Sequence, residues 1–435
     1  MTLFRPARLS RHAAAAAVVA GALVLTGCGS SSGANAGAAK SRGPITIWYS
    51  NNPAEIAWGK QVVAAWNSAN PKAKVTAQEI PAGKSSEEVI GAAITAGTEP
   101  CLIYNTSPAA VPGFQKQGGL VDLSSFADGA SYIEARTGAV AKQYASAGGH
   151  YFQLPWKSNP VMIFYNKKIF ATAGISTTAP PLGTYAQFLA TAQKIVSAKA
   201  APFAIYPSPS SDFFQPWFDF YPLFAAATGG KQLVVGGKAQ FTNAQGLAVA
   251  SFWRQMYVAK LAGTETYTGD AFADGKAAMA IVGPWAIAVY KGKVAWGVVP
   301  VPTATGTPAN QIHTFSDAKN IAMYASCTNQ ATAWDFMKFS TSSAQDGQLL
   351  TLTGQMPLRA DLPTTYPDYF AKNPEYKVFA EQAARTVEVP NIANSVEVWQ
   401  TFRDAWSSSV IFGKSPVQQA MTDAASKINQ LAGQS

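Results

Sequence analysis

The sequence has few of the side chains that most often carry out chemistry: of its 435 residues, 3 are cysteine, 3 are histidine and 13% are charged. The histidines, His12, His150 and His313, are far apart in the chain, so nothing indicates a zinc site. There is no block of Lys and Arg and no RNA-binding signature, which argues against a nucleic-acid-binding protein. Beyond the N-terminal segment there is no apolar run of about 20 residues, so we expect the body of the protein to lie outside the membrane.

Motifs for nucleophilic or nucleotide chemistry are also missing. The segment 29–33 matches the spacing G-x-S-x-G, but it has no strand before it and no helix after it. Gly83-Lys84-Ser85 lacks the glycine that a phosphate-binding loop carries five residues upstream, where Gln78 stands. The sequence therefore predicts no metal and no cofactor.

The N-terminal segment has the order of an export signal. Three arginines precede an apolar run at 13–25 that is too short to span a bilayer but fits the core of a signal peptide. Leu25-Thr26-Gly27-Cys28 resembles the lipobox of bacterial lipoproteins, which implies a signal at 1–27 and lipidation of Cys28. An ordinary secretory signal is the alternative. We expect the segment 28–43, rich in Gly, Ser and Ala, to be a flexible tether.

The composition of the mature chain suits a neutral partner. Removing the three signal arginines lowers the formal charge from +9 to +6, which is too dilute to indicate a nucleic acid. With 11% aromatic and few charged residues, the polar surface must come largely from Asn, Gln, Ser and Thr. The length predicts two domains.

The start of the mature chain alternates strands and helices. Residues 45–49 predict a buried strand, and Asn52 with the following proline predicts the start of a helix. A strand at 74–80, a helix at 87–96 and a strand at 101–104 follow, which indicates an α/β layer with a mostly parallel sheet.

Ligands of such sheets bind beyond the carboxyl ends of the strands. This places Asn51, Asn52, Asn105 and Thr106 together on one rim as candidate ligand contacts. Asn52 has a second possible use, because its side chain can cap its own helix.

The order of segments over 45–431 resembles family 1 of the solute-binding proteins of bacterial ABC sugar importers, which includes maltose-binding protein. Segments that carry the resemblance include "ITIWYS", "YFQLPWKSNPVMIFYNKKIF", "FADGKAAMAIVGPWAI" and "GKSPVQQAMTDAASKINQL". It implies the two-lobe α/β fold of periplasmic binding proteins of type II, with ligand in a cleft that closes about a hinge. The implied lobes are 44–156 with 318–361, and 157–317 with 362–435; the implied crossings lie near 154–161, 302–317 and 359–366.

The resemblance also gives the two remaining cysteines a role. In the family, the strand after the second crossing, here 320–325, runs antiparallel beside the strand at 101–104. This implies a disulfide between Cys101 and Cys327, which an exported location permits. The alternative is two free buried thiols.

The sugar site that the resemblance implies combines flat aromatic rings with polar groups. Trp285 matches a family tryptophan that stacks on ligand, Trp399 aligns with another, and a packed core position is the alternative for both. Trp217 is the candidate platform in an aromatic segment, with Phe218 as its alternative. The further candidates at the crossings are Trp156, Asn159, Phe315 and Asp317. Gln355 is a candidate at a position where relatives often carry an aromatic residue.

The implied function is that of the external binding component of an ABC importer. We expect a lipid-anchored monomer that captures a neutral mono- or oligosaccharide and delivers it to a membrane permease with a separate ATPase. A polyol, a glycerol-phosphate ester or a polyamine is an alternative ligand, although the rim offers a phosphate mainly Lys157 and Arg359. A lipid-anchored glycosidase is the alternative enzyme; it needs two carboxylates about 5–10 Å apart, and the available ones are Glu55, Asp212, Asp317 and Glu397.

Overall fold

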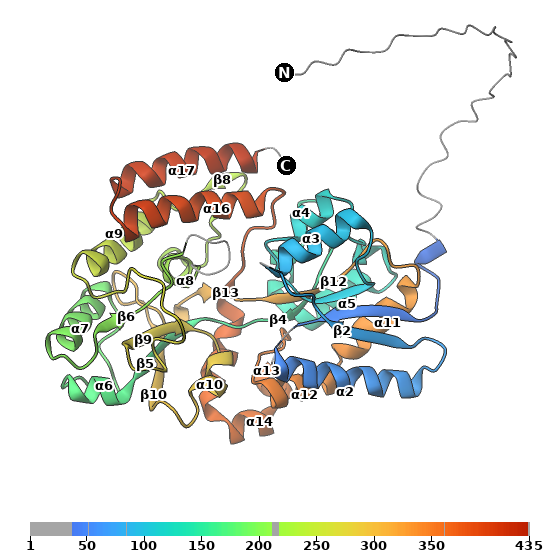
Figure 1. Ribbon diagram of the computed structural model, residues 1–435, viewed down its shortest axis with the longest axis horizontal. Helices are drawn as coiled ribbons and strands as arrows, with labels where there is room; N and C mark the ends of the chain where they lie inside the picture. Colours follow the sequence, from blue (N-terminus) through green and yellow to red (C-terminus); the bar gives the residue numbers. More distant parts are fainter. Residues whose placement is uncertain (1–36, 51, 84, 211–216, 361, 434–435) are drawn as a thin grey trace, which may run out of the picture.

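The computed structural model describes residues 37–433, apart from 51, 84, 211–216 and 361. Two β-sheets stand side by side, each covered by helices (Figure 1). The first sheet has the strand order β2-β1-β3-β12-β4 and the second has the order β10-β5-β9-β6. We call the first sheet with its helices lobe 1 and the second with its helices lobe 2. The mixed α/β fold with two sheets agrees with the fold that the sequence predicts.

Lobe 1 is built mainly from the N-terminal third of the chain. Its strands are β1 (Ile45–Tyr49), β2 (Val75–Glu79), β3 (Leu102–Thr106), β4 (Leu154–Lys157) and β12 (Lys319–Met323). Its main helices are α2 (Pro53–Ala69), α3 (Ser86–Ala96), α4 (Val111–Lys116), α5 (Gly129–Thr137), α11 (Gln330–Ser340) and α12 (Ser343–Thr353). β1 pairs in parallel with β2 and β3, whereas β12 is antiparallel to β3 and β4. The strands and helices predicted between 45 and 104 are confirmed to within two residues.

The start of α2 shows why its sequence forms a helix there. The side-chain oxygen of Asn52 accepts hydrogen bonds from the amides of Ala54 at 2.9 Å and Glu55 at 3.2 Å. These amides have no partner within the helix, so the cap stabilises the first turn, and Pro53 fits the first helical position. The predicted cap is confirmed, and it occupies the side-chain oxygen of Asn52.

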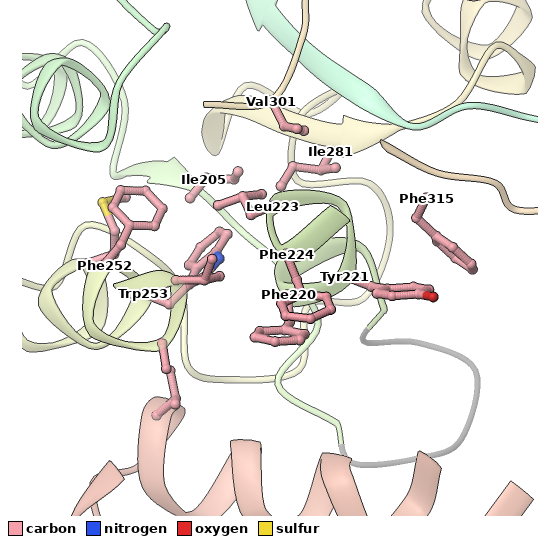
Figure 2. Close-up of a cluster of buried hydrophobic side chains, with 14 of the residues drawn as sticks. Ile205, Phe220, Tyr221, Leu223, Phe224, Phe252, Trp253, Ile281, Val301 and Phe315 are labelled. Atoms are coloured by element: carbon pink, nitrogen blue, oxygen red, sulfur yellow. The ribbon is translucent and has the colours of Figure 1, made fainter. Parts of the chain in front are cut away.

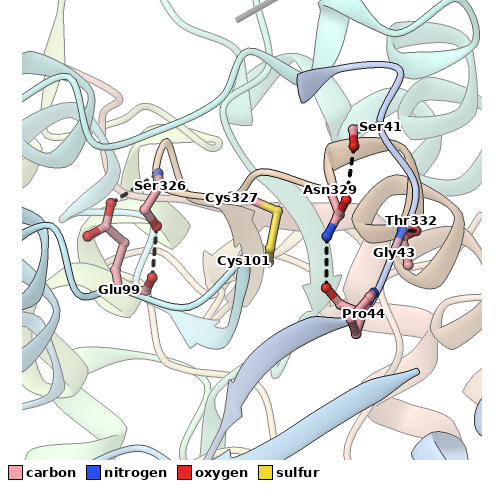
Figure 3. The surroundings of a disulfide bond; sticks show 9 residues. All are labelled: Ser41, Gly43, Pro44, Glu99, Cys101, Ser326, Cys327, Asn329 and Thr332. Carbon is pink, nitrogen blue, oxygen red and sulfur yellow. Dashed lines mark hydrogen bonds between the residues drawn. A yellow bond between two sulfur atoms is a disulfide. The ribbon is translucent and has the colours of Figure 1, made fainter. Parts of the chain in front are cut away.

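The predicted disulfide between Cys101 and Cys327 is confirmed (Figure 3). Met323 of β12 lies opposite Leu102 of β3 in an antiparallel register, which brings the end of one strand beside the start of the other. The disulfide thus crosslinks the amino end of β3, and Asn105 lies at the opposite, carboxyl end of the same strand. It fastens lobe 1 at the end away from the rim.

Lobe 2 contains the larger hydrophobic core. Its sheet strands are β5 (Met162–Asn166), β6 (Phe203–Ile205), β9 (Ala277–Val282) and β10 (Trp296–Val299). Around them lie α6 (Lys167–Thr172), α7 (Tyr185–Ser197), α8 (Trp217–Thr228), α9 (Ala244–Val258), α10 (Trp285–Tyr290), α13 (Leu362–Thr365), α14 (Pro367–Lys372), α15 (Lys377–Gln382), α16 (Ser395–Trp406) and α17 (Val417–Ala432). Figure 2 shows Phe220 and Phe224 of α8 in this core near Trp253 of α9.

The chain passes between the sheets in adjacent segments. β4 ends at Lys157 and β5 begins at Met162, whereas the short strand β11 (Thr314–Phe315) precedes β12 by three residues. The amide of Asp317 donates to the carbonyl of Asn159 at 3.3 Å, so the two passages are hydrogen-bonded to each other. β11 also pairs with β13 (Thr386–Val387). The lobe boundaries derived from the sequence stay predictions.

Candidate functional site

A cavity of about 810 Å³ lies against the sheet of lobe 2. Its wall comes from β9, the segment after β6, the start of α8, the loop at 266–272 and the start of α10. Asp317 and Lys319 complete the wall, and Lys319 is the first residue of β12 in the sheet of lobe 1. The cavity therefore lies where lobe 2 meets the second passage of the chain, and its volume is typical of small-molecule sites, which span about 300–1,000 Å³.

Trp285 is a half-buried aromatic side chain of this cavity. It begins α10 after Gly283-Pro284, and a Cβ added at Gly283 would lie 1.9 Å from the tryptophan ring. The ring thus lies directly on the backbone of Gly283, where a larger residue would displace it. The ring centroid of Trp285 lies 5.9 Å from that of Phe218. The position predicted for a stacking platform is therefore on the cavity wall.

The carboxylates that the described residues contribute to this wall already have partners. Asp219 pairs with Arg403 at 3.0 Å, and Asp317 pairs with Lys319 at 3.1 Å. Asp270 accepts from two backbone amides at 3.0 Å each. Burial tends to lower the pKa of Lys319, but the nearby carboxylates, Asp317 first, raise it above its ordinary value, so this side chain stays protonated. Asp219, Asp317 and Lys319 are therefore neutralised by ion pairs, whereas Asp270 is bound by backbone amides.

The rim of lobe 1 converges on the buried carboxylate of Glu55, which is 4% exposed. One of its oxygens accepts hydrogen bonds from Lys157 Nζ and Gln355 Nε2, both at 2.5 Å. The other oxygen accepts from Asn105 Nδ2, also at 2.5 Å. Asn105 and Gln355, two predicted ligand contacts, are thus brought together, but both donate to Glu55. We call Glu55, Lys157, Asn105 and Gln355 the Glu55 cluster.

The Glu55 cluster is held by charge. Burial alone raises the pKa of Glu55, but the charge and hydrogen bond of Lys157, with the bond from Asn105, lower it below its ordinary value. Burial likewise lowers the pKa of Lys157, and the carboxylate of Glu55 opposes that effect. Lys157 Nζ also lies 4.3 Å from the ring centroid of Trp156. The sequence offered Glu55 as a possible catalytic carboxylate, and no pattern in it pointed to this cluster.

Two of the predicted aromatic contacts, Trp156 and Trp399, pack in the lobe cores. Trp156 is 1% exposed, and its ring lies 5.2 Å from that of Trp58 and 5.1 Å from that of Tyr104. Trp399 is fully buried, 5.4 Å from the ring of Tyr221. Trp399 therefore lies in the core of lobe 2, which was the alternative to a ligand contact. We leave both tryptophans out of the proposed site, because their rings are covered by protein.

The other predicted contacts take varied positions. Phe315 is 5% exposed and packs beside Phe218, with centroids 6.2 Å apart. Thr106 is fully buried and donates to the carbonyl of Ile103. Asn159 is 2% exposed and donates to the carbonyl of Asp317 at 3.3 Å.

Some predictions fall outside the described residues: Cys28, Asn51, Asp212 and the side chain of Trp217. Arg359, which the sequence offered as a possible phosphate contact, donates to Asp346 at 2.9 Å and to Ser343 at 2.9 Å. Arg359 and Lys157 each have a carboxylate partner, so neither is an unpaired cation for a phosphate group.

Glu388 is another buried carboxyl group, and it lies between the lobes. It follows β13 and is 2% exposed; one oxygen accepts from the amide of Val389 at 2.7 Å and the other from the hydroxyl of Tyr144, in lobe 1, at 3.3 Å. Burial raises its pKa to about 8, although the charge of Lys319 opposes the shift. Glu388 is therefore mainly a neutral acid at pH 7. No local pattern in the sequence marks it.

Comparison with known proteins identifies the family of this chain. The model of the family described as bacterial extracellular solute-binding protein matches residues 50–347, which is more than half of the chain. The chain belongs to this family. The expectation of a solute-binding protein is therefore confirmed, whereas lipidation stays a prediction.

Two relatives align with most of the length of this chain. Maltodextrin-binding protein MdxE of Bacillus subtilis is 22% identical over 343 residues, covering 74% of this chain and 75% of the relative. Diacetylchitobiose binding protein DasA of Streptomyces coelicolor is 25% identical over 455 aligned positions, covering 95% of this chain and 96% of the relative.

Solved structures show the same fold. The GacH receptor of Streptomyces glaucescens has a TM-score of 0.72 at 22% identity and covers 90% of this chain and 99% of its own. The cyclic alpha-maltosyl-1,6-maltose binding protein of Arthrobacter globiformis has a TM-score of 0.76 at 18% identity, with 91% and 100% covered. The two-lobe fold of maltose-binding-protein-like proteins is thus confirmed.

In the part of the chain that the structure describes, no helix is long and apolar enough to cross a bilayer. No group of three or more His, Cys, Asp or Glu side chains in it could hold a metal ion.

The buried ion pair of the Glu55 cluster gives a stability prediction. Lys157→Met leaves the carboxylate of Glu55 buried without its cation, and we expect it to lower the free energy of unfolding by about 3–5 kcal/mol. Adding Glu55→Gln removes the orphaned charge and should restore much of the loss. Urea unfolding of the three proteins measures both effects.

The matched control is Lys338→Met. Its ion pair with Asp128, at 2.7 Å, is 29% and 50% exposed on its two sides, so we expect a loss of at most about 1 kcal/mol. Equal losses for Lys157→Met and Lys338→Met would contradict the role assigned to the Glu55 cluster.

Glu388 gives a prediction about pH. Its pKa is raised from 4.5 to about 8, so between these values the folded chain holds a proton that the unfolded chain releases. Through this group the free energy of unfolding therefore falls as pH rises from about 5 to 8. Glu388→Gln removes that contribution, and we expect its melting temperature to fall less than that of the wild type over this range. Glu381→Gln, at an exposed helical position, is the control and should follow the wild type; a Glu388→Gln profile parallel to the wild type would show that Glu388 does not titrate in this way.

Proposed function

We propose that this protein is the external binding component of an ABC importer and that it captures a neutral mono- or oligosaccharide in the cavity beside Trp285. The observation that carries the proposal is a half-buried tryptophan on a cavity wall where Asp219, Asp317 and Lys319 are ion-paired. A loaded protein would dock on a membrane permease that works with a separate ATPase.

The chemistry of the wall supports a sugar. A pyranose has apolar faces that lie well against a flat indole ring, and Trp285 offers such a ring. Its hydroxyls need uncharged donors and acceptors, and Ser208, Ser210 and Thr266 on the same wall are of that kind. The names of MdxE and DasA state that they bind a maltodextrin and diacetylchitobiose, which are both neutral saccharides.

The position of the cavity supports capture by closure. Its wall belongs mainly to lobe 2, while Asp317 and Lys319 belong to the passage toward lobe 1. A rotation about the hydrogen-bonded passages would move the rim with the Glu55 cluster relative to the cavity, as in hinge closure of periplasmic binding proteins.

The alternative ligands fit less well. A phosphate ester calls for paired cations, but Lys157 and Arg359 are each bound to a carboxylate. A polyamine calls for several unpaired carboxylates, and of the three on the described wall those of Asp219 and Asp317 have cationic partners. The same partners disfavour a glycosidase, whose acid and base must be available to substrate; Glu55 is held by Lys157, and Glu397 is an exposed residue of α16.

The first test is a thermal-shift screen with sugars, polyols, phosphate esters and polyamines. A ligand that binds only the folded protein raises its melting temperature. We expect stabilisation by a neutral saccharide; stabilisation by phosphate esters or polyamines alone would overturn the proposal.

Trp285→Ala then tests the site. We expect loss of the stacking surface to weaken saccharide binding about 5- to 150-fold, or about 1–3 kcal/mol, while the free energy of unfolding without ligand changes by less than about 1 kcal/mol. Calorimetric titration and denaturant unfolding measure the two quantities.

Trp399→Ala is the matched control, because this tryptophan is fully buried in lobe 2. It should cost about 3–5 kcal/mol of folding free energy and leave the affinity of the folded fraction nearly unchanged. A Trp285→Ala protein that behaves like this control would remove Trp285 from the site.

We further propose that the mature protein is a monomer attached to the external face of the membrane through a lipid on Cys28. Cys28→Ala should then release the protein from the membrane fraction without changing its affinity for saccharide. Fractionation of cells followed by immunoblotting measures the release, and a variant that stays with the membrane would contradict the lipid attachment.

A further inference from the structure

The cavity has a second aromatic pair, which the sequence did not reveal. Tyr206 follows β6, and Tyr267 lies in the loop before β9; both are half-buried residues of the cavity wall. Their ring centroids are 5.6 Å apart, with an angle of 58° between the planes. We call them the tyrosine pair.

The tyrosine pair and Trp285 occupy different parts of the wall. β6 runs parallel to β9 with Ile205 opposite Met279, so Tyr206 is level with the middle of β9. Trp285 begins α10 beyond the carboxyl end of the same strand. Because a strand rises about 3.3 Å per residue, the two aromatic surfaces are offset along the direction of β9.

Both rings of the tyrosine pair are held in place by neighbouring groups. A Cβ added at Gly263 would lie 2.2 Å from the ring of Tyr206, so this ring lies directly on the glycine backbone. The hydroxyl of Tyr267 donates to Asp274 at 2.9 Å. Fixed rings lose little conformational freedom when a ligand binds, which favours them as stacking surfaces.

We propose that the tyrosine pair is a second stacking surface and that the ligand is an oligosaccharide of at least two pyranose rings, one against Trp285 and another against the tyrosine pair. The volume of about 810 Å³ lies in the upper part of the usual range for small-molecule sites, which leaves room for more than one ring. This inference rests on the proposed function, since it extends the same cavity.

The test measures affinity against ligand length. Wild-type protein is titrated with glucose, maltose and maltotriose, and with N-acetylglucosamine and its β-1,4-linked dimer and trimer. We expect at least one series to bind more tightly at two or three rings than at one. This arm needs no variant, so it does not depend on how a substitution affects folding.

Tyr267→Ala and Tyr206→Ala supply the second arm. We expect each to weaken binding of the two- and three-ring ligands about 5- to 30-fold. Binding of the monosaccharide should change by less than about twofold, because that ring lies at Trp285. Tyr267→Phe keeps the ring and loses only the hydroxyl, and its affinities should stay within about threefold of the wild type.

The outcomes separate the two proposals. Wild-type affinity that does not rise with length, or tyrosine variants that weaken all lengths equally, would overturn the second stacking surface and leave the proposed function standing. If no saccharide of any length binds, the proposed function fails as well. Trp285→Ala should weaken all lengths, and this pattern distinguishes the two parts of the wall.

Discussion

The buried ion pair between Glu55 and Lys157 is the interaction on which the face of lobe 1 depends. Glu55 belongs to the first turn of α2, and Lys157 ends β4, the strand that leads out of lobe 1. Gln355 joins them from the segment after α12, and Asn105 from the end of β3. Two charges taken out of water are stable only while they remain paired, so this cluster holds four separate segments at the rim together.

A consequence is that the rim presents little unmatched charge. The amides of Asn105 and Gln355 are directed to one carboxylate, and that carboxylate is neutralised by Lys157. The same pattern recurs on the cavity wall, where Lys319 pairs with Asp317. Both the Glu55 cluster and the Asp317–Lys319 pair are therefore electrically balanced. A cleft with such balanced charges favours uncharged hydroxyl-rich ligands, whose apolar faces then need aromatic surfaces such as Trp285.

The second passage of the chain connects the cavity with the region between the lobes. Asp317 is hydrogen-bonded to Asn159 of the first passage and forms an ion pair with Lys319 at the cavity. The charge of Lys319 also opposes the rise in the pKa of the buried acid Glu388. Glu388 accepts a hydrogen bond from Tyr144 of lobe 1. Lys319 therefore links the ion pair at the cavity with the buried acid between the lobes.

Local features of the sequence predicted local structure well. The cap at Asn52 and the early strands follow from patterns within a few residues, and the Cys101–Cys327 pairing followed from the strand order of a related family. Trp156 packs in the core of lobe 1, which the sequence did not indicate, because every residue of β4 is buried and alternation does not distinguish its faces. Glu55 was missed because its partners lie 102 and 300 residues away in the sequence.

The tyrosine pair was equally invisible, since Tyr206 and Tyr267 belong to irregular segments that only the folded sheet brings together. The central claim is that ligand binds against Trp285 in the cavity of lobe 2. A crystal structure with the saccharide that most stabilises the protein tests it most directly. The account predicts a pyranose ring stacked on the indole of Trp285, with the Glu55 cluster intact. A saccharide bound elsewhere, with that indole uncovered, would contradict it.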